Sequence, residues 1–285
     1  MVQEAIRKAA VLIEALPYIK KFYRKVFIIK YGGSILSEDR VRKCVLEDIA
    51  FLRFAGIMPI IVHGGGPNIT GELKKHNIAT RFVEGMRVTD AATLKIVEKE
   101  LDKLNNLIVK EIEAHGVKAL SFKGKESILK AEKKESEVDL GFVGRVIGVD
   151  RDKLLNGLKD SIPVISPMGY SDKDKNVYYN INADDVAFFL ASQLKAEKLI
   201  LLTNVLGIMR NHSDSNSLIS SITVKGIEDL IKKKIIDEGM VPKARAAAAA
   251  IEAGVGKAHI VDAKISHAIL LEIFTDKGIS TEIVR

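Results

Sequence analysis

Cysteine is nearly absent from the sequence, which has a single one, Cys44, among 285 residues. A lone cysteine excludes a disulfide within the chain. Cys44 falls in a stretch with helical apolar spacing, where burial as a small hydrophobe is a more common role than nucleophilic chemistry. No cluster of cysteine and histidine has the spacing of a zinc site, so we expect no metal held by the chain itself.

Long apolar runs are missing as well. No run approaches the roughly 20 residues that a membrane-spanning helix needs. Residues 1–25 alternate charged and apolar side chains, unlike the continuous apolar core of a secretory signal. We therefore expect a cytoplasmic protein that does not contact a membrane.

Aromatic residues make up only 6% of the chain, and tryptophan is absent. The net charge is +7, but the 44 lysines and arginines are spread along the chain and mixed with 37 acidic residues. Nucleic-acid binding requires a concentrated basic surface or a recognised module, so we expect no nucleic-acid partner. Anionic small substrates explain the positive excess equally well.

Short β-branched apolar runs alternate with longer helical patterns along the chain. This alternation predicts an α/β fold in which helices cover both faces of a mainly parallel sheet. The region 124–150 is expected to form hairpins that interrupt the alternation of strands and helices. The sequence contains no long linker and no internal repeat. We expect strands at 26–32, 58–64, 117–123, 162–168, 198–204, 258–263 and 281–284. We expect helices at 41–55, 67–76, 90–115, 183–195, 225–235, 242–253 and 265–277.

Two predicted strands end in glycine-rich sequences, KYGGS at 30–34 and HGGGPNI at 63–69. Ligands of open parallel sheets gather beyond the carboxyl ends of the strands. Glycine lets backbone amides approach an anion without a Cβ in the way, and Pro67 stands at a helix start, where the helix dipole favours negative charge. Either loop alone could be an ordinary turn, but together they predict that two anionic groups meet. Neither has the Walker or GxGxxG pattern.

Further sequences carry groups that suit anionic ligands. MRVTD contains Arg87, whose planar fork suits a carboxylate, with a surface ion pair as the alternative role. NINADD opens a predicted helix, where Asn182 or Asp184 could instead be the N-cap. LLTN closes a strand with polar groups able to hold a nucleotide. EGMVPK contains Lys243 among apolar or small neighbours, so this charge is not part of a general solvated face.

In this order and at these spacings, KYGGS, HGGGPNI, MRVTD, DLGFVG, NINADD, KLILLTNVLGI and EGMVPK resemble the amino acid kinase family. The resemblance covers nearly the whole chain and is strongest to the arginine-sensitive, hexameric members that phosphorylate N-acetylglutamate. It implies a three-layer αβα sandwich with a mainly parallel central sheet and an additional N-terminal helix. The implied parts are an oligomerisation helix (1–24), an N-lobe that binds the acidic substrate (25–179) and a C-lobe that binds ATP and an arginine effector (180–285).

The resemblance also implies roles for individual residues. The implied catalytic residues are Lys30, Lys243, Asp184, Gly33 and Gly65. The implied contacts with the acid are Gly64, Gly65, Gly66, Arg87 and Asn180. The implied contacts with the nucleotide are Lys30, Gly32, Gly33, Thr203, Asn204, Gly207, Met240 and Lys243. We expect Mg²⁺ to arrive with ATP and to be held mainly by phosphate oxygens.

The implied reaction is phosphorylation of the γ-carboxylate of N-acetyl-L-glutamate by ATP, giving N-acetylglutamyl 5-phosphate and ADP in arginine biosynthesis. Phosphoryl transfer needs alignment and fixed positive charge more than covalent help. A carboxylate nucleophile needs no general base, because glutamate titrates at about 4.3. His63, before the glycines, is therefore interpreted as fixing the loop. Two alternatives remain, a kinase for a related acid such as carrier-linked α-aminoadipate or aspartate, and a non-catalytic arginine sensor.

Arginine control and assembly are further implications of the resemblance. Residues 11–25 have helical apolar spacing, and such a face must be buried on something. In the resembling forms this helix interlaces dimers into a hexamer, a trimer of dimers. Ala263 and Lys264 stand where arginine-sensitive forms usually carry a Gly-Arg pair, and Glu238 replaces a common glycine. The implied contacts of an arginine inhibitor are Tyr18, Lys198, His267 and Glu272.

Overall fold

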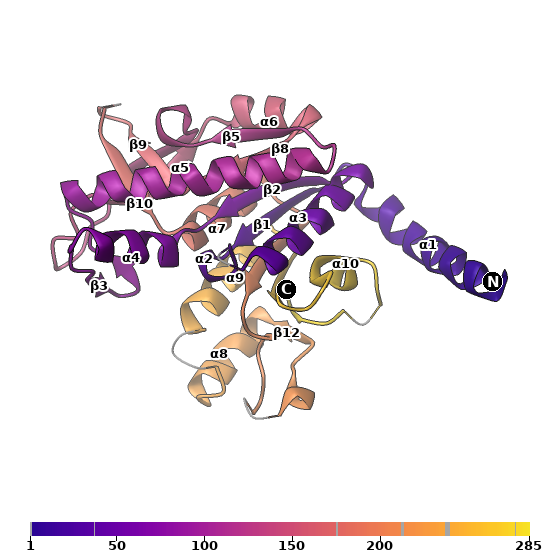
Figure 1. Ribbon diagram of the computed structural model, residues 1–285. Coiled ribbons are helices and arrows are strands. Elements are labelled where there is room, and N and C mark those ends of the chain that lie inside the picture. The colour runs from indigo at the N-terminus through magenta and orange to yellow at the C-terminus, as the bar shows by residue number, and fades with distance from the viewer. Residues whose placement is uncertain (1, 37, 175, 212–213, 237–239, 277) are drawn as a thin grey trace.

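An eight-stranded sheet forms the centre of the computed structural model, which describes residues 2–36, 38–174, 176–211, 214–236, 240–276 and 278–285 (Figure 1). The strand order is β12-β14-β13-β11-β1-β2-β8-β5. Neighbouring strands are parallel except β13 and β14, so β12 and β14 run against the other strands. The strands of this sheet are β1 (Val26–Tyr31), β2 (Met58–His63), β5 (Ala119–Phe122), β8 (Ile162–Ile165), β11 (Lys198–Thr203), β12 (Ser221–Thr223), β13 (Lys257–Asp262) and β14 (Thr281–Val284).

Every strand that the sequence predicts lies in this sheet, which confirms the α/β fold class. The sequence does not predict β12, because its three residues are too short for a periodic signal. The strand predicted at 162–168 ends sooner, at Ile165. Pro167 follows it and has no N–H to donate to a neighbouring strand, and Met168 already belongs to another sheet.

The central strands bury both of their faces, and successive residues enter different cores. Ile28 of β1 lies in one core with Ile60 and Val62 of β2, whereas Phe27 and Ile29 lie in the other. All of them are 0% exposed. Because strand side chains alternate between faces, this pattern requires a helical layer on each side of the sheet. The predicted three-layer αβα arrangement is therefore confirmed.

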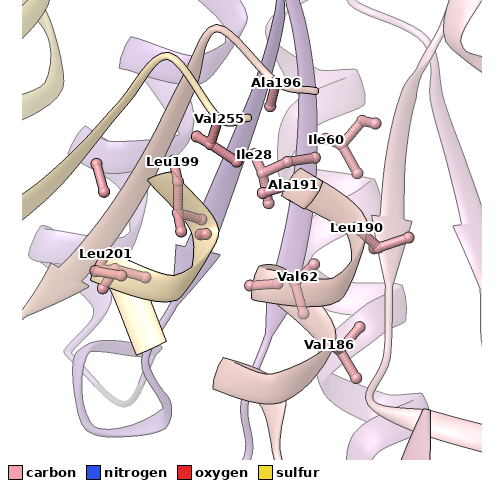
Figure 2. Close-up of a cluster of buried hydrophobic side chains, with 14 of the residues drawn as sticks. Ile28, Ile60, Val62, Val186, Leu190, Ala191, Ala196, Leu199, Leu201 and Val255 are labelled. Carbon is pink, nitrogen blue, oxygen red and sulfur yellow. The ribbon is translucent and has the colours of Figure 1, made fainter. Parts of the chain in front are cut away.

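Helices α6, α7, α8 and α9 supply one core, and α3, α5, α10 and the end of α1 supply the other. Figure 2 shows Val186, Leu190 and Ala191 of α7 in the first core, together with Ile28 and Ile60 of the sheet. The helices are α1 (Val2–Phe22), α2 (Gly33–Leu36), α3 (Asp39–Phe54), α4 (Gly66–Lys75), α5 (Ala91–Ala114), α6 (Arg151–Asp160), α7 (Ala183–Leu194), α8 (Val224–Lys232), α9 (Val241–Glu252) and α10 (Ala268–Ile273).

A second, smaller sheet closes into a four-stranded barrel. Its strands β6 and β7 pair antiparallel, which confirms a hairpin within 124–150. The sequence does not predict β9 and β10, because four-residue strands carry little periodic signal. Strand β10 leads directly into α7 and so carries Asn180 toward the central sheet. The barrel strands are β6 (Leu129–Lys133), β7 (Val143–Val149), β9 (Met168–Ser171) and β10 (Tyr178–Ile181). Strands β3 (Phe82–Val83) and β4 (Met86–Arg87) form a separate two-stranded sheet.

Capping side chains fix where the functional helices begin. Asp90 accepts a hydrogen bond from Thr93 N at 2.7 Å at the start of α5. Asn182 accepts one from Asp184 N at 2.9 Å at the start of α7. Asn182, rather than Asp184, is therefore the N-cap of α7, so the Asp184 carboxylate can serve other partners.

Helix α10 is shorter than the helix predicted at 265–277. His267 directly before it has φ 56° and ψ 34°, in the left-handed region that a continuous helix cannot contain. Helix α1 projects away from the sheet, with the N-terminus at its far end (Figure 1). In the described ranges, no helix is both long enough and apolar enough to cross a membrane.

Candidate active site

A carboxylate joins two lysines at one edge of the central sheet. Lys30 Nζ lies 2.8 Å from Asp184 Oδ1, and Lys243 Nζ lies 3.7 Å from Asp184 Oδ2. The side chains of Lys30 and Asp184 are 12% and 16% exposed, and that of Lys243 is 32% exposed. Two ammonium groups share one carboxylate, so the group as a whole carries a net positive charge.

Separate elements bring these three residues together. Lys30 lies near the carboxyl end of β1, Asp184 in the first turn of α7, and Lys243 in the first turn of α9. Helices α7 and α9 precede β11 and β13, which run parallel to β1. Each helix runs back across the sheet before its strand, so both helices begin at the edge where the strands end.

The two glycine-rich loops face each other at this edge. A Cβ on Gly33 would lie 2.8 Å from Gly66 N, which is closer than real Cβ atoms come to other atoms. It would also lie 3.1 Å from Gly65 N, a distance that real Cβ atoms rarely show. Only glycine therefore permits this approach. Pro67 stands in the first turn of α4, whose N-terminus carries the positive end of the helix dipole. The two loops thus meet at the N-terminus of α4, the arrangement that the predicted anion cradle requires.

A chain of polar side chains, in which His63 and Asn105 are fully buried, supports the second loop. Ser121 Oγ donates to Asn105 Oδ1 at 2.6 Å, and Asn105 Nδ2 donates to His63 Nε2 at 3.1 Å. Because an amide nitrogen only donates, Nε2 accepts and the proton of His63 sits on Nδ1, which donates to Gly64 O at 3.1 Å. Burial lowers the pKa of His63 to about 4, so the ring is neutral. His63 therefore anchors Gly64, whereas sequence reasoning missed Asn105 entirely.

Arg87 presents a buried guanidinium near the glycine loops. It is 7% exposed, donates to Thr70 Oγ1 at 2.7 Å and to Gly66 O at 3.2 Å, and stacks on the Phe82 ring with Cζ 4.7 Å from the centroid. Burial lowers its pKa. Within the described residues no carboxylate forms an ion pair with it. Arg87 is therefore not the surface ion pair of the alternative prediction, and it suits the carboxylate of a ligand.

One cavity of about 330 Å³ is lined by Lys30, Arg87 and the glycine loops, whereas Asp184 and Lys243 lie outside its lining. Asn180 also lines it, and the Asn180 amide donates to Thr89 Oγ1 at 3.2 Å, which fixes its orientation. This volume is at the small end of ligand pockets and suits a molecule of amino acid size. The predicted residues that line the cavity are Lys30, Gly33, Gly64, Gly65, Gly66, Arg87 and Asn180.

Five of the residues predicted to contact a nucleotide lie at the end of β11 or after it, namely Thr203, Asn204, Gly207, Met240 and Lys243. Gly207 and Met240 line a small apolar cleft of about 40 Å³. Thr203 ends β11 and donates from Oγ1 to Val205 O at 2.9 Å, and Asn204 beside it is exposed. Gly32 does not line the cavity of about 330 Å³. A Cβ on Gly32 would nevertheless lie 3.7 Å from Lys30 Nζ. Glu238 and Gly239, which precede Met240 in EGMVPK, lie outside the described residues.

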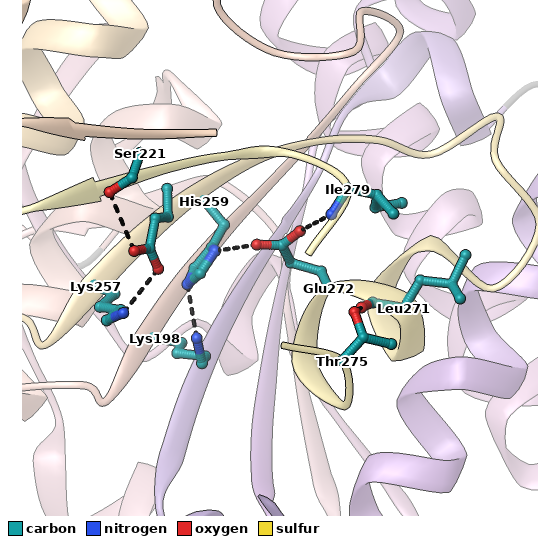
Figure 3. A network of polar contacts seen from close by, with 9 residues as sticks. Lys198, Ser221, Lys257, His259, Leu271, Glu272, Thr275 and Ile279 are labelled. Carbon is teal, nitrogen blue, oxygen red and sulfur yellow. Dashed lines mark hydrogen bonds and ion pairs between the residues drawn. The ribbon is translucent and has the colours of Figure 1, made fainter. Parts of the chain in front are cut away.

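A different cavity, of about 720 Å³, lies between the end of α1, strand β13 and helix α10. Tyr18, Lys198 and Glu272 line it, as the effector prediction requires, but His267 does not. Figure 3 shows His259 between Lys198 and Glu272. Lys198 Nζ lies 2.8 Å from His259 Nε2, and His259 Nδ1 lies 2.7 Å from Glu272 Oε1. Sequence reasoning missed His259, which sits inside an apolar strand and belongs to no motif.

This second cavity carries both signs of charge. Burial, together with the nearby Lys257 ammonium, lowers the pKa of Lys198 to about 8. Burial opposes ionisation of Glu272, but hydrogen bonds from His259 and from Ile279 N lower its pKa overall. Tyr18 donates its hydroxyl to Asp276 on the same lining. Ammonium and carboxylate groups within one cavity suit a zwitterionic ligand.

Proteins of known sequence show where this arrangement belongs. The model of the amino acid kinase family matches residues 25–262. A protein named acetylglutamate kinase from Carboxydothermus hydrogenoformans is 46% identical over 291 aligned residues, covering 98% of this chain and 98% of its own. Another of the same name from Syntrophomonas wolfei is 45% identical over 288 residues, covering 100% of both. The similarity therefore includes α1, which precedes the region matched by the family model.

Solved structures share the architecture. The N-acetylglutamate synthase from Neisseria gonorrhoeae, complexed with coenzyme A and N-acetyl-glutamate, has a TM-score of 0.87 at 24% identity, and the match covers 97% of this chain. This chain spans 63% of that longer protein. A structure of the same synthase with coenzyme A and L-arginine has a TM-score of 0.82, also at 24% identity, and the match covers 97% of this chain and 65% of that one. At this identity the likeness shows a shared fold and does not carry function.

Proposed function

The chain belongs to the amino acid kinase family, and on that premise we propose that it phosphorylates N-acetyl-L-glutamate with ATP in arginine biosynthesis. The products are N-acetylglutamyl 5-phosphate and ADP. The single observation that carries the proposal is Asp184 between Lys30 and Lys243, next to two facing glycine loops. The name shared by relatives at 46% identity supports the choice of acid.

The geometry suits transfer to a carboxylate. An oxygen of the γ-carboxylate forms a bond to the γ-phosphorus of ATP while the bond from that phosphorus to the β,γ-bridging oxygen breaks, and ADP leaves with the electron pair. Negative charge spreads over the phosphoryl oxygens during transfer. Lys30, Lys243 and the loop amides offset this charge. No base is needed, because the acceptor is already ionised at neutral pH.

The proposed contacts with N-acetylglutamate are made by residues that line the cavity of about 330 Å³. Arg87 takes the α-carboxylate of N-acetylglutamate, because its guanidinium is buried and lacks an acidic partner among the described residues. Asn180 takes the amide-bearing end, since Thr89 already fixes its orientation. Gly64, Gly65 and Gly66 then line the path of the γ-carboxylate toward Lys30.

The proposed contacts with ATP include residues in and around the cleft after β11. The cleft of about 40 Å³ is smaller than a purine, so Gly207 and Met240 contact only part of the base, and Thr203 and Asn204 supply polar groups at the strand end. Gly32 and Gly33 bring the phosphates toward Lys30, and Lys243 approaches from α9. In this division residues 25–179 supply most of the acid site, to which Asn180 is added, and residues 180–285 supply the site of the base, whereas the phosphates also contact Lys30, Gly32 and Gly33.

Magnesium is expected to enter with ATP. Mg²⁺ prefers oxygen ligands and commonly binds through substrate phosphates with one or two carboxylates. Asp184 already pairs with two ammonium groups, so this site offers no cage for a free ion. Bound to the phosphates, Mg²⁺ supplies further positive charge to the transferred group.

We also infer that the cavity of about 720 Å³ binds arginine as an inhibitor. Glu272 suits a guanidinium, and Lys198 suits the α-carboxylate. Tyr18 connects this cavity with α1. A related fold is known with L-arginine, the synthase of Neisseria gonorrhoeae. Ala263 and Lys264 depart from the Gly-Arg pair of sensitive forms, and His267 lies outside this cavity, so none of these three residues contributes to the proposal.

Helix α1 supports a proposal of assembly into a hexamer built as a trimer of dimers. Its last turns pack on the body, where Phe22 is 4% exposed. Residues 2–16 leave several apolar side chains uncovered in the single chain. The exposed apolar residues are Val2, Ile6, Val11, Leu12, Ile13 and Leu16. A second copy of α1 presents the same surface and can cover it.

The substrate proposal is tested by ADP release with N-acetylglutamate, N-acetylaspartate and carrier-linked α-aminoadipate as acceptors. We expect N-acetylglutamate to have the highest kcat/KM. Preference for the aminoadipate carrier would replace the proposed substrate, although one methylene changes specificity by only about 10–200-fold. Arginine binding without turnover of any acid would instead identify a non-catalytic sensor.

A further inference from the structure

Three metal-ligating side chains meet where α3 packs against α10. Cys44 and Asp48 are one helical turn apart on α3 and share a face, and His267 immediately precedes α10. One ligand atom from each of the three lies within 4.8 Å of the other two. None of these residues lines the cavity of either the proposed substrate or the proposed inhibitor.

The distances approach those of a tetrahedral cation site. Cys44 Sγ lies 3.7 Å from His267 Nδ1. Bonds of about 2.3 Å to sulfur and about 2.0 Å to nitrogen at a tetrahedral angle separate these ligand atoms by about 3.5 Å. Asp48 Oδ1 lies 2.7 Å from the same nitrogen, as a hydrogen bond does. An opening of less than about 1 Å between these two atoms therefore makes room for an ion.

The cluster is anchored on its inner side and accessible on its outer side. The Asp48 side chain is 1% exposed, and the His267 side chain is 48% exposed. Ile269 N donates to Asp48 Oδ2 at 3.2 Å, so the other carboxylate oxygen faces the histidine. The backbone N–H of His267 donates to Cys44 Sγ at 3.2 Å. Such outer hydrogen bonds orient metal ligands before the metal arrives.

A nucleophilic role for Cys44 does not fit this geometry. A relay of thiol, imidazole and carboxylate uses two different ring nitrogens of the histidine. Here Cys44 Sγ and Asp48 Oδ1 both approach Nδ1 of His267. Sulfur, nitrogen and oxygen ligands converging on one point suit a zinc-type ion, whereas Mg²⁺ and Ca²⁺ prefer oxygen alone.

We propose that Cys44, Asp48 and His267 bind one zinc-type divalent cation, with water as the fourth ligand on the exposed side. On binding, the thiol proton of Cys44 passes to solvent, and the proton on Nδ1 of His267 passes to solvent or to Nε2. The ion ties α3 to α10, the helix that carries Glu272. Spacing rules could not find this site, because the histidine lies 223 residues from the cysteine.

The experiment uses the full chain, freed of metal with a chelator and titrated with Co²⁺. A bond between cobalt and thiolate gives an intense near-ultraviolet band. Cys44 is the single cysteine of the chain, so this band reports only this site. We expect one Co²⁺ per chain, displaced by Zn²⁺, and at least about 10-fold weaker binding in His267→Ala and in Asp48→Asn. The exposed His115 provides the matched control, and His115→Ala should bind as wild type does.

Absence of the band in the wild-type protein overturns the proposal. A band that keeps its full affinity in His267→Ala overturns it as well, because the thiol alone would then bind the ion. His267 is half exposed, so this variant is expected to fold, and its circular dichroism verifies that it does. His267→Ala therefore remains decisive even if Asp48→Asn, which alters a buried side chain, does not fold.

Discussion

The Lys30 ammonium and the Asp184 carboxylate form an ion pair of 2.8 Å where β1 ends. The same carboxylate approaches Lys243 at 3.7 Å from the opposite side. Because Asp184 is mostly buried, water screens its charge only weakly, and it can hold both ammonium groups in fixed positions. Asp184 is therefore expected to matter for the rate of transfer more than for the binding of either substrate.

Asp184→Asn should lower kcat by about 100- to 1,000-fold, the usual loss when one preorganised electrostatic contact is removed from a transition state. The KM values for both substrates should change little. Steady-state kinetics measure this. Asp185→Asn is the matched control, because Asp185 pairs with Lys134 at 3.6 Å instead. Equal losses in the two variants, or a raised KM with unchanged kcat, would contradict the role assigned to Asp184.

Arg87→Lys should raise the KM for N-acetylglutamate by about 10- to 100-fold and leave the KM for ATP unchanged. A lysine keeps the charge but loses the planar fork that binds a carboxylate through two hydrogen bonds. The exposed Arg81 allows a matched control, Arg81→Lys, which should behave as wild type does. An equal rise in both KM values would show that Arg87 supports the fold of the site and does not contact the acid.

The strands and the loops at their ends were predictable because the signals are local. Lys30 follows one β-branched run, and the glycines and Pro67 follow another. Each predicted ligand-binding motif is therefore adjacent in the sequence to the strand that positions it. Parallel sheets then bring such strand ends to one edge. Helix caps were also predictable in type, although only the structure decides that Asn182, and not Asp184, accepts the capping hydrogen bond.

Contacts between distant segments were not predictable in this way. Asn105 reaches His63 across 42 residues, and His259 lies between Lys198 and Glu272 only because β11 and β13 are neighbours. The paired carboxylate of His267 is 219 residues away on α3. Hydrophobic periodicity gives the face on which a side chain lies, but it does not give the partner across that face.

The stability of the protein should fall as the pH drops from about 6.5 to about 4, partly through His63. Burial lowers the pKa of His63 from its usual 6.5 to about 4, so in this window the unfolded chain binds a proton that the folded chain does not. Above about pH 6.5, His63 makes its full contribution to the free energy of unfolding. Below that pH the contribution falls by up to about 1.4 kcal/mol per pH unit. Thermal unfolding at several pH values measures the trend.

His63→Gln removes the titrating group and should flatten this part of the pH dependence. The exposed His115 supplies the control, since His115→Gln should keep the wild-type slope. If His63→Gln retained the full slope, the fall in stability would arise from other groups and not from the neutral ring that anchors Gly64.

Arginine affinity should weaken as the pH rises through about 8, because burial lowers the pKa of Lys198 to about 8 and its ammonium is then lost. Calorimetry at about pH 7 and about pH 9 measures the change, since free arginine keeps its guanidinium charge throughout. Lys198→Gln should bind weakly at both values, and Lys195→Gln, at an exposed neighbouring position, should follow wild type. A constant affinity would separate Lys198 from arginine binding.

Deleting residues 1–13 should convert the proposed hexamer into a dimer. This deletion removes five of the six exposed apolar residues of α1, all except Leu16. It leaves Phe22, which is 4% exposed, in its core. Light scattering gives the mass, and Glu14→Gln in the full-length chain is the control for a polar change on the same helix. A mass that the deletion does not alter would mean that α1 makes no contact between subunits.

The central claim is tested most directly by trapping the acyl phosphate with hydroxylamine during turnover of ATP and N-acetylglutamate. We expect hydroxamate to form in step with ADP in the wild-type protein. Lys30→Ala and Lys243→Ala should each lower that rate by at least about 100-fold, as the loss of a transition-state contact does. Release of ADP without hydroxamate, or full hydroxamate formation in either lysine variant, would contradict the account.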